Sequence, residues 1–533
     1  MTANSDGKMG PVAADTASFM RDESRHSPFT GLTRRGVLRG VGQAFAAAAV
    51  SPIARPALLL GQIDAGRTAA ERPVSEVMTR LSTYMSEARD RALPDEVVER
   101  ARRHILDTIA AMVSGTELVP GRAALRFARS YGGAPVATVV GDRVVCGPIE
   151  AAMVNGTLAH ADETDDTLAP GPWHPGCNVV PAALALGEQF GASGARVVRA
   201  VVLGYDVGTR VMAAIQPGLQ TGLKLPYGIA GVFGAAAAGG ALAGFDPQKM
   251  RWTLSYAAQQ SSGLETFPRD PDHIEKGFIF GGMPARSGVT AVLLVHNGWT
   301  AVHDAMVGPE SFVTAHAPAG KAELLVERLG ERYEITRANI KRWTVGFPIH
   351  APLDAIEALL KRQPIDPGRV QELVVRYQPG SITDNSGPSD INVQHALAVM
   401  LIDRRLTFKS IHDADRMRDP AVVRLRGKMR LVAAQPGGPA PPLLQFTMAD
   451  GSRIVQDGVG PVLGTAANPL SREQLVAKCR SLMTPVLGAA QTGRLIDRVM
   501  TLDTMPDVRA LRPLLQHARR QGPPRLSEYP DAG

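Results

Sequence analysis

The sequence predicts a mainly α protein, in which a large helical domain carries a smaller α+β unit inserted late in the chain. Three observations support this prediction. From Pro148 to about Gly244 the chain reads as successive Ala- and Gly-rich segments with helical spacing of apolar residues. Beyond about residue 303, short strand-like runs alternate with helical ones. After Pro469 the helical pattern returns.

Length and composition narrow the class of protein. A chain of 533 residues is long enough for two or three domains, and 44% hydrophobic with 20% charged residues is ordinary globular usage. The net charge of +7 is dispersed and only 5% of residues are aromatic, which argues against a nucleic-acid partner. The three cysteines form no close pair, so we expect no disulfide framework, zinc ribbon or iron–sulfur cluster.

The first 70 residues resemble a leader. Residues 1–30 are polar and predict a disordered arm, and residues 31–70 contain Arg34-Arg35 before a weakly apolar run from Val41 to Ala54. An arginine pair before such a run is typical of a twin-arginine export signal, so we expect a periplasmic or otherwise exported protein. The run is too short to span a membrane, and we expect no membrane partner beyond the signal. If the signal is misread, the chain is cytoplasmic.

Helical patterns dominate the region after the leader. An apolar face repeats through Val77, Leu81 and Tyr84, and a second helix is predicted from Asp95 to Gly115. The segment 230–243 has almost no charge, so we expect it to be buried on all sides. Further helices are predicted to begin at Ser193-Gly194 and at Asp246-Pro247.

The late part of the chain mixes strands and helices. Strands are predicted at residues 333–335, 372–377 and 444–448, a hairpin turn at 449–451, and helices at 351–361 and 392–402. A last helix is predicted after the capping residue Ser471. The tail, residues 521–533, is expected to be loose.

The densest polar cluster runs from His160 to His174. Four carboxylates fall within the five residues 162–166, where they repel one another and are costly to pack without a use. Three prolines stiffen the loop, which suits acid–base chemistry. Two other interpretations stay open: a solvated acidic loop with a helix cap at Asp166 or Thr167, and a divalent-metal site.

Two later segments could hold anions. In the first, Lys276 and Arg286 flank a Gly-rich stretch that could bind carboxylates through charge-assisted hydrogen bonds; the alternative is an ordinary helix start. In the second, residues 340–354, Lys341, Arg342 and His350 precede a helix and could together hold an anion. A structural histidine is the alternative for His350.

Several motifs in this order resemble the MmgE/PrpD family, which contains 2-methylcitrate dehydratases and cis-aconitate decarboxylases. The resemblance covers roughly residues 74 to 520, and the order in which these motifs occur along the chain is more specific than any single motif. The matching stretches are Arg102-Arg103-His104-Ile105-Leu106-Asp107-Thr108, Asn155-Gly156 to Thr167 with the later His174-Pro175, Gly204-Tyr205-Asp206-Val207-Gly208-Thr209-Arg210, Gly282-Met283-Pro284-Ala285-Arg286-Ser287-Gly288, and Asn468-Pro469-Leu470-Ser471 with Lys478.

The resemblance implies a fold and an activity. It implies an all-helical domain built from residues 74–302 and 460–520, with an α+β lid at residues 303–459. It also implies chemistry on small polycarboxylates without a cofactor or metal, in a homodimer.

The resemblance also implies positions for the site residues. Thr167 and His174 fall on active-site positions of the family, and Glu163 falls where the family has an aspartate. Lys276 lies close to the family's substrate lysine, and His350 falls on a lid histidine. One departure is Leu225-Pro226, where the family pattern leads us to expect His-Pro, and another is a His160–His174 spacing about one residue longer than expected.

These residues predict a lyase that dehydrates a small di- or tricarboxylate in the manner of 2-methylcitrate dehydratase. We expect His174 to be the base or proton shuttle, with Glu163 or Asp165 orienting it or protonating the leaving oxygen. Substrate is expected to be bound by Thr167, His160, Lys276, Arg286 and His350. Decarboxylation and epimerisation use the same parts and stay open. An exported polycarboxylate-binding protein without catalysis, suggested by Leu225, and a metal-dependent hydrolase are the alternatives from other classes.

Overall fold

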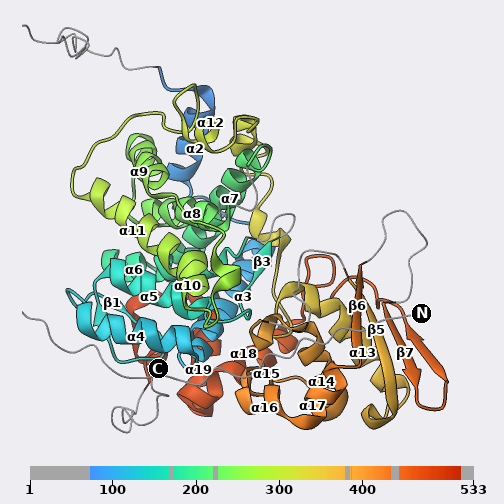
Figure 1. Ribbon diagram of the computed structural model, residues 1–533. Helices are drawn as coiled ribbons and strands as arrows, with labels where there is room; N and C mark the ends of the chain where they lie inside the picture. Colours follow the sequence, from blue (N-terminus) through green and yellow to red (C-terminus); the bar gives the residue numbers. More distant parts are fainter. Residues whose placement is uncertain are drawn as a thin grey trace, which may run out of the picture. The chain divides into compact units, whose positions relative to one another are not determined.

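The computed structural model describes residues 73–168, 173–219, 226–377, 385, 387–433 and 443–517. The predicted arm and export signal, the tail from residue 521, and Leu225 lie outside these residues. Helices make up most of the described chain, so the mainly α prediction is confirmed (Figure 1).

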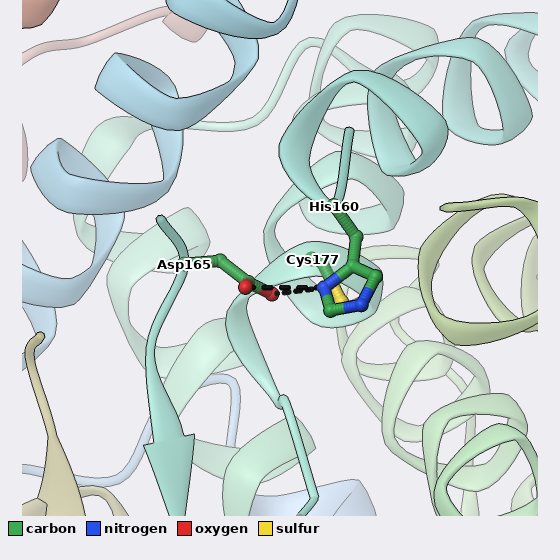
Figure 2. A group of neighbouring side chains, drawn as sticks. All are labelled: His160, Asp165 and Cys177. Atoms are coloured by element: carbon green, nitrogen blue, oxygen red, sulfur yellow. Dashed lines mark hydrogen bonds and ion pairs between the residues drawn. The ribbon is translucent and has the colours of Figure 1, made fainter. Parts of the chain in front are cut away.

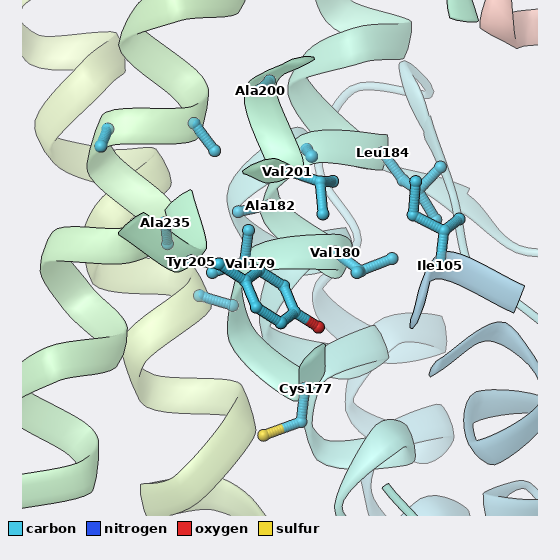
Figure 3. Packing of buried hydrophobic residues seen from close by; sticks show 14 of the residues in the cluster. Ile105, Cys177, Val179, Val180, Ala182, Leu184, Ala200, Val201, Tyr205 and Ala235 are labelled. Carbon is cyan, nitrogen blue, oxygen red and sulfur yellow. The ribbon is translucent and has the colours of Figure 1, made fainter. Parts of the chain in front are cut away.

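A first hydrophobic core is built by helices from the N-terminal half and from the C-terminal end. At its centre α7 (Gly194–Ile215) and α11 (Met283–His296) both pack against α8 (Pro226–Leu242). Figure 3 shows part of this core, where small and branched side chains interlock around Tyr205. The other helices are α2 (Glu76–Glu87), α3 (Asp95–Gly115), α4 (Val119–Tyr131), α5 (Pro148–Ala159), α6 (Gly176–Phe190), α9 (Pro247–Gln260), α10 (Ile274–Gly277), α12 (Phe312–His316), α18 (Arg472–Leu487), α19 (Ala489–Val499) and α20 (Arg512–Leu515).

Helix α8 is buried on nearly all sides, as its lack of charge predicts. Every residue from Gly228 to Leu242 is buried. The run Ile274–His296 is long and apolar enough to cross a membrane, but 67% of its apolar window is buried inside the protein. Apolarity on all faces is what a helix surrounded by other helices requires.

The last helices return to the first core. Ser471 caps α18 and forms a capping box with Gln474, as the predicted helix start requires. Helix α18 packs against α3, and the Lys478 Nζ donates to Asp107 Oδ1 at 2.6 Å. Segments separated by more than 300 residues therefore share one core.

A second core lies between helices and a four-stranded sheet. The strand order is β6-β5-β7-β8, with β5 and β6 parallel and the other pairs antiparallel (Figure 1). The predicted hairpin turn after residue 448 is confirmed, and Gly451 there has the left-handed φ of 80° that such a turn needs. The elements are α13 (His350–Arg362), β5 (Val370–Tyr377), α14 (Val393–Asp403), α15 (Phe408–His412), α16 (Ala414–Arg418), α17 (Pro420–Arg426), β6 (Met429–Ala433), β7 (Leu444–Met448) and β8 (Arg453–Gln456).

The strand predicted at residues 333–335 is wrong. The chain forms a 3-10 turn at Glu334–Arg337, because Glu334 is held from three sides. Its backbone N–H donates to Asp206 at 2.6 Å, and its carboxylate pairs with Arg332 and Arg337. A two-residue strand, β4 (Ala338–Asn339), follows and pairs with β3 (Thr167–Leu168).

Along the sequence, the first core gives way to the second near residue 341. The first core includes residues up to Ile340 and from Leu470 onward, and the second runs from Trp343 to Met448. Residues 303–340 contribute side chains such as Phe312 and Ile335 to the first core. The division into a helical domain and a lid stays a prediction.

Candidate active site

The acidic segment after α5 is buried. The residues from Asp162 to Thr167 are at most 5% exposed, which excludes the solvated acidic loop. Asp166 anchors the segment: it accepts hydrogen bonds from Tyr205 Oη at 2.6 Å and from the Gly176 N–H at 2.8 Å, and contacts His104 Nδ1 at 2.6 Å. The segment is thereby fixed against α3, α6 and α7.

Asp165 orients two imidazole rings. Both of its oxygens lie 3.1 Å from His160 Nδ1, and Oδ1 lies 3.2 Å from His174 Nδ1 (Figure 2 shows the first contact). An ionised carboxylate only accepts, so both Nδ1 atoms donate, and an imidazole in its neutral form then keeps a lone pair on Nε2. The two ring centroids are 4.8 Å apart.

Charges around these rings set their protonation. Burial lowers the pKa of His174 despite the neighbouring Asp165, so its ring is neutral near pH 7. Burial alone would raise the pKa of Asp165, but His160 and His174 hold it well below its usual range. The geometry therefore pairs an ionised carboxylate with imidazoles that can take up a proton.

Glu163 joins two lysines. Its carboxylate contacts Lys276 Nζ, and its second oxygen lies 3.0 Å from Lys341 Nζ, which also donates to the Glu163 carbonyl at 2.8 Å. Burial alone would raise the pKa of Glu163, yet the two lysines hold it well below its usual range. Burial alone would lower the pKa of Lys341, but Glu163 and Asp165 raise it. Glu163 and Lys341 are therefore both charged at neutral pH.

Two glycines bring the lysine segment to the histidines. A Cβ on Gly281 would lie only 2.1 Å from the Gly156 carbonyl oxygen, so the backbones of α5 and of the π-helical turn Phe278–Gly282 touch here. This contact positions Phe280, whose ring stacks on His160 with centroids 4.6 Å apart. It also places Lys276, one turn earlier, next to Glu163.

Further titratable groups close the cluster from the second half of the chain. His412 Nε2, on α15, lies 3.2 Å from Asp162 Oδ2. His273 Nδ1 lies 4.0 Å from Asp390 Oδ2. Both histidines and both carboxylates are largely buried.

The predicted site residues divide into two sets. His160, Glu163, Asp165, His174 and Lys276 lie together in one cluster. The other three lie around it: Thr167 Oγ1 donates to the Trp173 carbonyl at 3.4 Å, Arg286 lies 5.9 Å from the Phe278 ring centroid, and His350 Nε2 lies 3.2 Å from the Val345 carbonyl. Within the described chain, Arg286 forms no ion pair with this cluster.

One residue of the cluster, His273, was not singled out from the sequence, and another, Lys341, was named only as one of three possible anion-binding residues with Arg342 and His350. Burial and Lys341 lower the pKa of His350 to about 3. A lysine next to an arginine is an ordinary surface pattern, so only its full burial reveals the role. For His273 the sequence holds no signal.

The cluster does not favour a metal ion. Two sets of three groups lie within 4.8 Å of one another, His160 with Asp165 and Cys177 (Figure 2), and His160 with Glu163 and His273. Glu163 is already bound by two ammonium groups, and burial raises the pKa of the Cys177 thiol well above its usual range. The fixed cations instead suit an anionic ligand, with imidazoles beside it for proton transfer.

Comparison with known proteins points to one family. Sequence models of the MmgE/PrpD N-terminal and C-terminal domains match residues 79–325 and 343–503. The cis-aconitate decarboxylase of Aspergillus terreus is 26% identical over 479 residues, which cover 83% of this chain and 96% of that protein. The human cis-aconitate decarboxylase is 25% identical over 453 residues, covering 80% of this chain and 91% of that protein.

Proposed function

This chain belongs to the MmgE/PrpD family, and we propose that it is a lyase that removes CO2 from a small unsaturated tricarboxylate. One observation carries the proposal: Glu163 holds two buried ammonium groups beside two imidazoles that share Asp165. The decarboxylase relatives supply the reaction class and the candidate substrate, cis-aconitate.

The lysines suit the carboxylates of such a substrate. Glu163 fixes the ammonium groups of Lys276 and Lys341 on either side of one carboxylate. Each ammonium group has three donors, so it can hold Glu163 and still bind a substrate carboxylate. Because the cations are fixed before substrate arrives, little rearrangement opposes binding.

Loss of CO2 leaves an electron pair that must be delocalised and then protonated. In cis-aconitate the bond between the methylene carbon and its carboxylate breaks, and the pair moves through the double bond toward the remote carboxylate. Lys276 and Lys341 stabilise the negative charge there. His174, protonated beside the bound trianion, delivers a proton from Nε2 to the carbon next to that carboxylate and then takes one from water. One CO2 is released and one proton is consumed.

Incubation with cis-aconitate in D2O tests this proposal. NMR should show a five-carbon dicarboxylate with a terminal methylene C=C bond and one deuterium on the carbon that received the proton. CO2 should form in equal amount. Recovery of cis-aconitate unchanged, with no CO2 and no deuterium, would contradict the proposal.

Dehydration of a hydroxy acid like 2-methylcitrate is the second candidate. The neutral His174 favours it, because an unprotonated imidazole is the base that removes a carbon-bound proton. The proton then resides on Nε2, the C–O bond breaks as the double bond forms, and the hydroxyl leaves as water with a proton from solvent, after which Nε2 returns its proton to solvent. Release of water from 2-methylcitrate without CO2 would select this candidate. Binding of both acids without turnover would select a binding protein.

Assembly and location stay proposals as well. We propose a homodimer exported by the twin-arginine route, as the arginine pair at residues 34–35 and the family resemblance lead us to expect. Light scattering of the purified protein tests the dimer. Fractionation of cells producing the full chain and its Arg34→Lys/Arg35→Lys variant tests export.

A further inference from the structure

His273, at the start of α10, has no part in the reaction above, yet it lies in the same cluster. Its residue surface is only 7% exposed, and its ring centroid lies 5.5 Å from that of His160. One of its ring nitrogens lies within 4.8 Å of a ring nitrogen of His160 and a carboxylate oxygen of Glu163. His273 therefore borders the same space as the acid–base groups.

The backbone at His273 is strained. Its φ of 60° and ψ of 11° are left-handed, a conformation that a residue with a Cβ seldom adopts. Such residues cost on the order of 1 kcal/mol or more and cluster at functional sites. The fold therefore holds this imidazole in place against a conformational cost.

The two ring nitrogens of His273 have different surroundings. Nδ1 lies 4.0 Å from Asp390 Oδ2, and the Asp390 carbonyl accepts from the Gly346 N–H at 2.8 Å, which fixes that residue. Nε2 is buried and has no hydrogen-bond partner among the described residues. A buried polar atom without a partner is unfavourable, so Nε2 is suited to a group that enters from outside.

The charges nearby decide which group that is. A metal ion at Nε2 would share Glu163 with two ammonium groups, which repel it. An anion would instead be attracted by Lys276 and Lys341. The entering group is therefore a carboxylate, in keeping with the proposed function, on which this inference rests.

The protonation state of His273 depends on what surrounds it. The charged and titratable groups that face it are Lys276, His160, Glu163, Asp165 and Asp390. Burial, followed by the charge of Lys276, holds the pKa of His273 well below its usual range. The ring is therefore neutral near pH 7, and a nearby negative charge would reverse the effect of Lys276.

We propose that His273 is a substrate-binding residue, which takes a proton from solvent onto Nε2 as a polycarboxylate binds and donates that N–H to a substrate carboxylate. One N–H bond forms, the proton comes from water or buffer, and no bond of the ligand breaks. Asp390 then lies beside the positive ring as its counter-charge.

Calorimetric titration with tricarballylate, a saturated tricarboxylate without the double bond, tests this proposal. Titrations at pH 7 in two buffers of different ionisation enthalpy give the number of protons taken up per bound ligand. The wild-type protein should take up protons. His273→Asn should take up about one fewer and should bind about 10- to 100-fold more weakly, since hydrogen bonds to charged groups are strong.

Asn is chosen as the replacement because of the left-handed backbone conformation at residue 273. Asn tolerates the left-handed region better than most residues, and it lacks the distal nitrogen. The control is His395→Asn, in α14: burial lowers the pKa of His395 to about 4, and both of its nitrogens are buried without a partner among the described residues. This variant should keep wild-type affinity and proton uptake.

Three outcomes would overturn the inference. The first is proton uptake in His273→Asn equal to that of the wild type. The second needs no variant: the wild-type protein binds tricarballylate without taking up protons. Tight binding of one Zn2+ that is lost in His273→Asn would assign the ring to a metal. If turnover of cis-aconitate persists in these cases, the proposed function stands and only the role of His273 fails. If neither turnover nor binding is found, both fail.

Discussion

The Asp165 carboxylate fixes the tautomers of two imidazoles, and His174 is the one that transfers the proton. We therefore expect the turnover number to be most sensitive to substitution of His174. His174→Ala leaves Asp165 bound to His160 and removes a side chain that is only 9% exposed. We expect the turnover number to fall at least about 100-fold, because general acid–base catalysis contributes about 10²–10⁴. Circular dichroism should remain unchanged. A turnover number near that of the wild type would remove His174 from the mechanism.

Glu163 links the site to stability. In Glu163→Gln two buried lysines lose their shared counter-charge, and we expect a loss of about 3–5 kcal/mol in the free energy of unfolding at pH 7. Urea unfolding followed by circular dichroism measures this loss. A loss below about 1 kcal/mol would show that solvent or other groups compensate the lysines.

The same carboxylate makes stability depend on pH. Its folded pKa lies well below the ordinary value of 4.5, so its stabilisation is present above pH 4.5 and is lost as pH falls through the folded pKa. The difference between wild type and Glu163→Gln should therefore shrink in acid. An equal difference at pH 7 and pH 3 would contradict this assignment.

Among the elements, α5 and the π-helical turn approach each other closely at the site through their backbones. Gly281→Ala would force a Cβ to within 2.1 Å of the Gly156 oxygen, so the turn must move. We expect a loss of about 2–4 kcal/mol in stability together with weaker substrate binding, because Lys276 lies on the displaced segment. Thermal unfolding and KM measure these effects.

Gly493 provides the matched control. It lies inside α19, has no left-handed φ, and a Cβ there meets nothing within 4 Å. Gly493→Ala should stabilise the protein by about 0.5–1 kcal/mol, since alanine favours the helix. If both variants behave alike, the close approach does not constrain the turn.

The elements also show what the sequence can and cannot predict. Helix α3, with clear apolar periodicity, and helix α18, with a capping box, were placed correctly, because local sequence determines them. The run at residues 333–335 has the composition of a strand, but its structure depends on Asp206 more than 100 residues away. The cluster around Asp165 was predicted from local density of charge, whereas Lys341 and His273 join it through tertiary contacts alone.

In the molecule as a whole, the charged cluster is enclosed by segments from distant parts of the chain. His160, Asp165 and Lys341 are at most 1% exposed, so a substrate reaches them only if a covering segment moves. One such segment is α15, which contributes Ile411 to the second core and places His412 on Asp162. This ion pair joins a helix of the second core to the acidic segment of the first.

The pair should make the closure of α15 depend on pH. Burial alone would lower the pKa of His412, but Asp162 raises it above 6.5, so the stabilisation is present below pH 6.5 and is lost as pH rises through the folded pKa. After correction for the intrinsic rate, amide hydrogen exchange in residues 407–418 should accelerate above that pKa. In His412→Gln the exchange should be faster throughout and should not change with pH. Helix α19, which carries no such pair, serves as the internal reference, and identical pH dependence in wild type and His412→Gln would show that another contact holds α15 closed.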